Sequence, residues 1–291
     1  MTYQTGIYQT GRDYLAAARK RVLLFGMSGL GKTHLANMLR DQGPWFHYSV
    51  DYRIGTRYMN EFIADNFKRE AMKVPLLREL LMTDSVYIAS NITFNNLAPL
   101  STYLGKPGDP AKGGLPFADY IERQQLHRSA EVAAMLDTAR FMQRAEAIYG
   151  YANFVCDTSG SICEVVDPAR ADDPVLRQLS DTHLLVWIKG SDDHTAELIR
   201  RFDRAPKPMY YQPEFLHVVW GEYRATHSVT EETCDPDHFV RWTYARALAH
   251  RQPRYAAMAR WGVTVSAEEV ARVRAPASFD AMIARALDQR G

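Results

Sequence analysis

The hydrophobic pattern of this chain alternates between short apolar runs and longer segments with apolar residues at helical spacing. The short runs stop abruptly at glycine, aspartate or another polar residue. Five can be read along the chain: "RVLLF" (21–25), "WFHYSV" (45–50), "NFVCD" (153–157), "HLLVWI" (183–188) and the first part of "GVTVSAEEVARV" (262–273), which passes from a strand into a helix. Continuous apolar runs of this length fit strands buried on both faces of a parallel sheet. The pattern therefore predicts five strands.

The segments between these strands indicate helices of very different lengths. A glycine- and proline-rich segment at 105–116 is instead typical of a loop. The stretch "SVYIASNITF" (85–94) fits either a strand or a loop. The expected helices cover 14–20, 33–40, about 56–81, 117–149 with a break near Asp137, the first part of 196–211, 237–260, and a last short helix after 266.

Strands that alternate with helices predict an α/β fold, here a three-layer α/β/α arrangement around a five-stranded parallel sheet. Ligands of such sheets bind at the carboxyl ends of the strands. A single domain spanning 1–291 is expected, with a helical and loop insertion at 79–150 and a smaller helical insertion at 209–245.

Composition and charge exclude several classes of protein. Among 291 residues, 35 Lys+Arg balance 34 Asp+Glu to a net charge of +1, so no overall field favours nucleic acid or an acidic membrane. The three cysteines lack the spacing of a zinc ribbon or a disulfide framework. The N-terminal stretch has no apolar signal-peptide core, and no apolar run approaches the roughly 20 residues that span a bilayer. A cytoplasmic protein with a small-molecule substrate, and without nucleic-acid or membrane partners, is expected.

The first predicted strand is followed by an octet that matches the P-loop pattern G-x-x-x-x-G-K-[ST] at every required position: Gly26, Met27, Ser28, Gly29, Leu30, Gly31, Lys32 and Thr33. In a P-loop, backbone N–H groups converge on phosphate oxygens at the positive N-terminus of the next helix. Lys32 would reach the β- and γ-phosphates, and the Thr33 hydroxyl would bind Mg²⁺. The octet and the following His34 are therefore predicted to bind ATP with Mg²⁺.

The residues at the end of the third predicted strand indicate which class of P-loop protein this chain resembles. It carries one acid, Asp157, followed by small residues, whereas AAA+ and helicase-type ATPases place two acids in a row there. The N-K-x-D motif of GTPases does not occur in the chain. A single strand-end acid with small residues after it is more typical of small-molecule kinases.

Three further segments, in the right order, resemble the shikimate kinase group within the nucleoside monophosphate kinase-like fold. The segment "SVDYRIGTRYMNEFIADNF" (49–67) is similar to that family's strand-end Asp and amphipathic helix, which implies that Asp51 contacts the acceptor hydroxyl. "HLLVWIKGSDDHTAELIRRFDRAPKP" (183–208) resembles the fourth strand and lid, which implies that Arg200 and Lys207 cover the nucleotide. "HRQPRYAAMARWGVTVSAEEV" (250–270) resembles the R-x-P-x-Y helix, which implies that Arg251 grips an acidic substrate.

The chain departs from this family's pattern at two places near the expected site. The acid that helps to hold Mg²⁺, two residues before the hydroxyl-binding Asp, is Ser49 here, so Asp157 is implied to supply that carboxylate. The glycine triplet after the third strand is replaced by "TSGS" (158–161), and Ser159 and Gly160 are expected to line the substrate pocket. These departures argue against shikimate itself as the substrate.

The resemblance predicts a phosphotransferase in which Lys32, Asp51 and Arg200 act on the transferred phosphate and its acceptor. Arg53 and Arg78 are candidates for bidentate binding of an anionic acceptor. The alternative is a P-loop ATPase or nucleotide switch whose long middle segment binds a protein partner. Within that segment, "NITFNNLAPLSTYLGKPGDPAKGG" (91–114) could line a pocket or be a surface excursion. The acceptor, the choice of ATP over GTP and the oligomeric state stay open.

Overall fold

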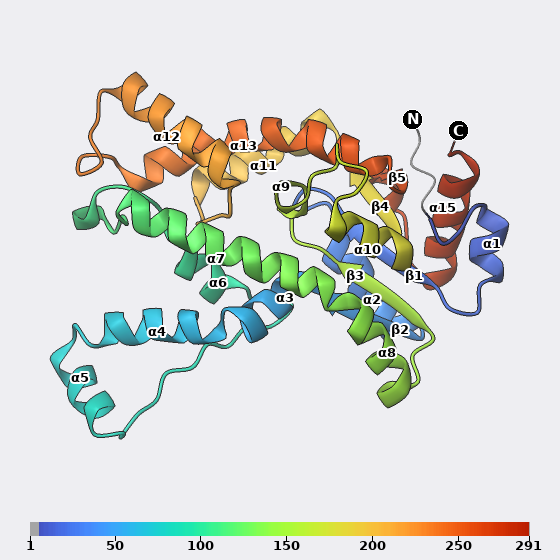
Figure 1. Cartoon of the computed structure of the whole chain (residues 1–291), viewed down its shortest axis with the longest axis horizontal. Helices are drawn as coiled ribbons and strands as arrows, with labels where there is room; N and C mark the ends of the chain where they lie inside the picture. Colours follow the sequence, from blue (N-terminus) through green and yellow to red (C-terminus); the bar gives the residue numbers. More distant parts are fainter. Residues whose placement is uncertain (1–5, 291) are drawn as a thin grey trace. The chain divides into compact units, whose positions relative to one another are not determined.

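The five strands form one all-parallel sheet with the order β2-β3-β1-β4-β5 (Figure 1). The computed structural model describes residues 6–290. Its strands are β1 Arg21–Phe25, β2 Trp45–Ser49, β3 Asn153–Asp157, β4 Leu184–Lys189 and β5 Val263–Ser266. The predicted α/β class and all five predicted strands are confirmed.

Helices cover both faces of this sheet. On β2, Trp45 packs edge-to-face against Phe279 of α15 (Pro276–Asp288), with ring centroids 5.7 Å apart. The next residue, Phe46, packs against Phe141 and Tyr149 of α8 (Thr138–Tyr149). Because successive side chains of a strand point to opposite faces, α15 and α8 lie on opposite sides of β2. This arrangement is compatible with the predicted three layers.

The central strand β1 explains where a ligand site is expected. Its residues Val22 to Phe25 are fully buried, as a strand covered on both faces requires. The chain leaves β1 toward β2 on one side, and it leaves β3 across β1 toward β4 on the other side. Crossovers in opposite directions open a crevice at the carboxyl ends of the strands, beside β1.

The helices largely follow the predicted pattern. The break at Asp137 is confirmed, since α7 ends at Leu136 and α8 begins at Thr138. The first helix lies earlier than predicted. The predicted helical region at about 56–81 begins with a π-helical turn and is then interrupted between Ala71 and Pro75. The helices before β3 are α1 Gly11–Ala16, α2 Lys32–Gln42, α3 Val50–Arg53, the π turn Ile54–Tyr58, α4 Asn60–Ala71, α5 Pro75–Met82, α6 Ala98–Leu104, α7 Phe117–Leu136 and α8.

The ambiguous stretch at 85–94 contains no strand and only begins an isolated bridge between Thr93 and Asn96. The loop predicted at 105–116 is confirmed, apart from a single 3-10 turn, Pro110–Lys112. Between residues 6 and 290, no helix combines the length and apolar character that crossing a bilayer requires. The helices after β3 are α9 Ile162–Val165, α10 Pro174–Thr182, α11 Asp192–Arg204, α12 Pro213–His227, α13 Pro236–Ala259, α14 Ala267–Val270 and α15.

The described chain divides into two compact units. Unit 1 contains the sheet and comprises 6–50, 131–205 and 241–290. Unit 2 is helical and comprises 51–130 and 206–240. The two insertions predicted at 79–150 and 209–245 each overlap unit 2, which already begins at Asp51. The single-domain organisation stays a prediction.

Candidate functional site

The glycine-rich loop connects the end of β1 to the start of α2 at the centre of the sheet. Gly26 has φ 139°, and a Cβ built on it would lie 2.5 Å from the carbonyl oxygen of Ile188, so only glycine fits there. Gly31 caps α2 in the left-handed conformation, with φ 93°. The predicted strand–loop–helix context is therefore confirmed, and the loop follows the strand next to which the crevice is expected.

Three other elements of unit 1 approach this loop. A Cβ on Gly29 would lie 3.1 Å from Leu198 of α11, two residues before the predicted lid residue Arg200. Gln252 of α13 donates a hydrogen bond to the Met27 sulfur at 3.1 Å. A Cβ on Gly160, after β3, would lie 2.7 Å from Ser28 Oγ. The loop is thus enclosed by α11, α13 and the β3 exit.

The Lys32 side chain turns back into the loop from the first residue of α2. Its Nζ donates hydrogen bonds to the carbonyl oxygens of Gly26, at 2.8 Å, and Met27, at 3.0 Å. The side chain is buried, with 6% of the residue exposed. Loop carbonyls therefore hold a buried ammonium group where the P-loop pattern predicts phosphate contacts.

A polar contact at the mouth of the loop joins Thr33 to Asp157. The hydroxyl of Thr33, in the first turn of α2, donates to Oδ2 of Asp157, the last residue of β3, at 2.6 Å. His47 Nε2 lies 3.8 Å from the same oxygen. Sequence analysis predicted Thr33 and Asp157 as the metal ligands, and the structure brings them together.

A hydroxyl and a carboxylate side by side fit Mg²⁺, which prefers hard oxygen ligands and keeps several of its waters. No group of three or more His, Cys, Asp or Glu residues within 6–290 has the arrangement of a metal site. Such a group is not required for Mg²⁺, because one or two protein ligands suffice when phosphate oxygens complete the coordination. The residue pair therefore suits a cation that the phosphates of a nucleotide also coordinate. It does not suit a metal ion held by protein ligands alone.

Glu131 is a buried acid that sequence reasoning did not single out. Both carboxylate oxygens are occupied, since Ser159 Oγ donates to Oε1 and Ser161 Oγ donates to Oε2 at 2.7 Å. Tyr255 donates its hydroxyl proton to the Gly160 carbonyl between the two serines. Burial, followed by the nearby Cys163, raises the pKa of Tyr255 well above its usual value, so this donor stays protonated. Glu131 and Tyr255 therefore fix the position of the β3 exit, whose Gly160 lies close to Ser28 of the glycine-rich loop.

Arg251, predicted to grip an acidic substrate, has an internal partner. Its Nη2 donates to Glu164 Oε2 at 2.7 Å, and both side chains are buried. Burial acts to lower the pKa of Arg251, but the Glu164 carboxylate outweighs it, so the pKa is raised and the guanidinium stays charged. Sequence reasoning did not find Glu164. The substrate role of Arg251 stays a prediction.

The other predicted side chains are distributed between the units. Asp51 lies in the short helix α3 and not at the strand end, because β2 stops at Ser49. In unit 2, the Arg53 guanidinium lies 5.6 Å from the centre of the Tyr58 ring, and Arg78 donates to the Met72 carbonyl at 2.8 Å. In unit 1, the exposed Arg200 pairs with Glu197 at 2.8 Å. His34 lies exposed on α2, and Lys207 belongs to unit 2.

The structure thus assembles the glycine-rich loop, Thr33, Asp157 and Gly160 in unit 1, with Arg200 on a helix that reaches the same loop. Comparison of the chain with protein-family models, curated proteins and solved structures finds no match. The candidate site therefore rests on the geometry of this chain alone.

Proposed function

We propose that this protein is a cytoplasmic P-loop phosphotransferase, similar to the shikimate kinase group, that moves the γ-phosphate of ATP to a hydroxyl of a small anionic metabolite. One observation carries the proposal: the Thr33 hydroxyl bonds the Asp157 carboxylate at the mouth of a glycine-rich loop whose lysine points inward. A structural turn needs neither an inward lysine nor a hydroxyl–carboxylate pair between the start of a helix and the end of a strand. A P-loop uses both.

In this proposal the loop's N–H groups and the start of α2 bind the triphosphate. Lys32 exchanges its two loop carbonyls for phosphate oxygens and offsets the charge that develops on the transferred group. Thr33 and Asp157 hold Mg²⁺, which when bound neutralises phosphate charge. Arg200 on α11 and Lys207 cover the nucleotide and exclude water. Asp51 orients the acceptor hydroxyl.

A thermal-shift screen of hydroxylated, carboxylated and nucleoside metabolites, with and without a non-hydrolysable ATP analogue, tests this proposal. An acceptor stabilises the folded state by mass action, and a ternary complex makes that shift depend on the analogue. ADP release that requires the selected metabolite would then establish transfer. ADP release with no metabolite at all would contradict it.

Asp51→Asn is expected to leave ATP affinity within about twofold of wild type while slowing transfer by roughly 10²-fold. The substitution keeps the size of the side chain and removes the carboxylate that orients or deprotonates the acceptor. Asp65→Asn, an exposed acid of α4 that pairs with Lys68, is the matched control and is expected to change neither quantity. Equal transfer rates in the Asp51 and Asp65 variants would remove Asp51 from the mechanism.

Gly160→Ala tests whether the β3 exit controls the glycine-rich loop. The added methyl would lie 2.7 Å from Ser28 Oγ and 3.3 Å from Ser28 N, so the Ser28 side chain must turn away and the loop backbone must give by a few tenths of an ångström. We expect nucleotide affinity, measured by calorimetry, to fall at least tenfold and to be largely restored by adding Ser28→Gly, which removes the clashing oxygen. Gly221→Ala is the control, because its Cβ would meet nothing within 4 Å. Wild-type affinity in the Gly160 variant would disprove this coupling.

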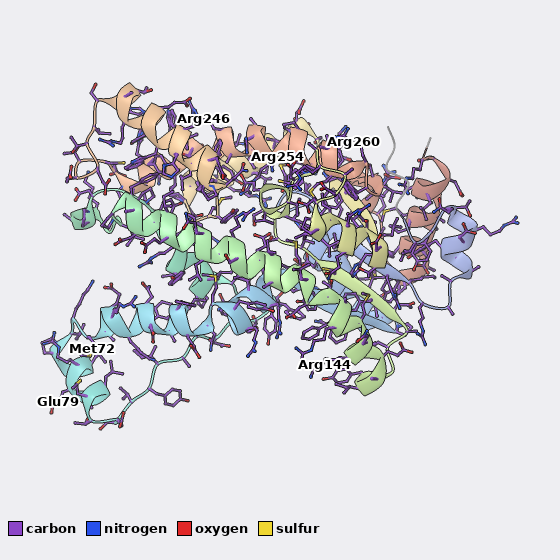
Figure 2. All side chains as sticks on the ribbon, in the orientation of Figure 1. Met72, Glu79, Arg144, Arg246, Arg254 and Arg260 are labelled. Carbon is purple, nitrogen blue, oxygen red and sulfur yellow. The ribbon has the colours of Figure 1, made fainter. Side chains whose placement is uncertain are left out.

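A second candidate function is a P-loop ATPase or switch that binds a protein partner. The exposed apolar side chains of the arm, by which we mean residues 74–87 of unit 2, favour it. Figure 2 shows the side chains of this region, with Met72 and Glu79 labelled. Exposed apolar clusters of this kind often mark interaction sites. Slow ATP hydrolysis without an acceptor, stimulated by a protein, would favour this candidate. Six large apolar side chains of the arm are exposed: Val74, Leu76, Leu77, Met82, Val86 and Tyr87.

A further inference from the structure

Unit 1 contains a pocket of about 390 Å³ beside the edge strand β5, where the chain turns from α13 into that strand. Ligand pockets for small molecules typically measure roughly 300–1,000 Å³. In the sheet, β4 separates β5 from β1, and no residue of the glycine-rich loop lines the pocket. It is therefore separate from the candidate active site. The residues that give it its chemistry are Arg260, Val263, Thr264, Ala286, Gln289 and Arg290.

The turn that carries Arg260 is held in place by buried neighbours. The next residue, Trp261, is 1% exposed, and its backbone N–H donates to the Met258 carbonyl at 2.9 Å. A Cβ built on Gly262 would clash with the carbonyl oxygen of Leu185 in β4, so only glycine fits at this close approach. The backbone of Arg260 is therefore positioned before any ligand binds. Figure 2 labels this arginine directly after α13.

The lining of the pocket is positively charged, because it contains two arginines and no acid. Arg260 is exposed and forms no ion pair with any carboxylate of residues 6–290. Its Nε donates to the Ala257 carbonyl at 3.4 Å, which leaves the two terminal nitrogens as donors. Arg290 has a further interaction within the chain, so we assign the leading role to Arg260. A guanidinium group binds a phosphate or carboxylate group through two parallel hydrogen bonds.

The other lining residues fit the rest of such a ligand. Thr264 and Gln289 are exposed, and their side chains make no hydrogen bond to another residue in the described part of the chain. A hydroxyl and an amide can donate to further oxygens of an acidic group. Val263 and Ala286 supply a small apolar wall. An arginine that only stabilises the C-terminal end of a helix needs neither a pocket nor a second guanidinium beside it.

From this geometry we infer that the pocket is a second ligand site of unit 1, and that it binds a small molecule with one phosphate or carboxylate group on an apolar body. Arg260 binds the acidic group, and Arg290 adds to the positive potential around it. The apolar body lies against Val263 and Ala286. The inference is independent of the proposed phosphotransfer, because no residue proposed for that reaction lines this pocket.

The test uses the full chain without nucleotide and three probes with an aromatic ring in ligand-observed NMR. Phenyl phosphate and benzoate each carry an acidic group, whereas benzyl alcohol is neutral. We expect at least one of the two anions to bind at least tenfold more tightly than benzyl alcohol, and comparison of the two shows which acidic group is preferred. If neither anion binds more tightly than benzyl alcohol, the inference is overturned.

Variants locate the binding. Arg260→Gln is expected to weaken the preferred anion at least tenfold and to leave benzyl alcohol unchanged. Arg285→Gln is the matched control, because it also removes an exposed guanidinium, from α15 but outside the lining, and affinity should stay within twofold of wild type. Equal losses in these two variants would mean that overall charge, and not the pocket, attracts the anion, and would overturn the inference.

Lys32→Ala distinguishes this pocket from the glycine-rich loop, which is itself proposed to bind phosphate groups. We expect the affinity for the anion to be unchanged in this variant. Binding that is lost in Lys32→Ala and retained in Arg260→Gln would place the anion in the glycine-rich loop and overturn the inference. Failure of the wild-type protein to release ADP with any metabolite would contradict the proposed phosphotransfer but not this site, since the probes are tested without nucleotide.

Discussion

Lys32→Ala is expected to lower ATP turnover by roughly 10³-fold, since one removed charge-stabilising group of this kind typically costs about 10²–10³ in rate. The reason is positional. Lys32 Nζ already lies within the glycine-rich loop, held by the Gly26 and Met27 carbonyls, and no helix-surface lysine can replace it there. Steady-state ADP release measures the effect, and calorimetry with ATP separates lost binding from lost chemistry.

The control for this variant is Arg40→Ala, in the last turn of the same helix α2. It also removes one cation, but from an exposed side chain that pairs with its neighbour Asp41. Turnover is expected to stay within about twofold of wild type, because surface ion pairs contribute little. A similar loss in both variants would mean that net charge or helix stability, and not the loop, governs turnover.

The strands and the loop were predictable because their causes are local. A strand buried on both faces must be apolar throughout, as in Val22 to Phe25, and such a run is visible without any knowledge of its neighbours. Likewise, Gly26 and Gly31 are needed for backbone conformations that other residues rarely adopt. Asp157 could be placed for a similar reason, because it ends a recognisable strand.

Partnerships over long distances in sequence were not predictable. Glu131 accepts hydrogen bonds from Ser159 and Ser161, which follow it by 28 and 30 residues. Glu164 pairs with Arg251, which lies 87 residues further along the chain. A buried acid on a helix resembles a solvated one until its partners are known. The signal that sequence offered for Glu131 was a lone acid within the apolar stretch "SAEVAAML" (129–136).

The connection after β2 shows how tertiary packing displaces a predicted boundary. The sequence pattern places Asp51 at the end of a strand. In the structure the strand ends at Ser49, and helix α3 begins at Val50. The π-helical turn that follows contains Gly55, and a Cβ there would lie 2.6 Å from Ile92. Close approach of a distant segment therefore shapes this turn, and a local pattern does not contain that information.

Asp157→Asn is expected to lower Mg²⁺-dependent turnover by roughly 10²-fold or more without destabilising the protein. The carbonyl oxygen of the new amide would still accept the Thr33 hydroxyl proton, so the fold keeps that bond, but the charge that holds the cation is gone. Among the described residues, Asp157 contacts no lysine or arginine whose charge its loss would leave unpaired. Thermal unfolding without nucleotide should therefore match wild type or rise.

Glu164→Gln is the matched contrast, because it also neutralises a buried acid of unit 1. Here the loss removes the carboxylate that offsets the charge of the buried Arg251 guanidinium, and breaking a buried ion pair in this way typically costs about 3–5 kcal/mol of unfolding free energy. Urea unfolding of the two variants should therefore diverge, with a large loss only for Glu164→Gln. The comparison separates a carboxylate kept for ligand binding from one kept for structure. If Asp157→Asn were the strongly destabilised variant and its turnover still responded to Mg²⁺ as in wild type, Asp157 would be a structural acid and the proposed cation site would be wrong.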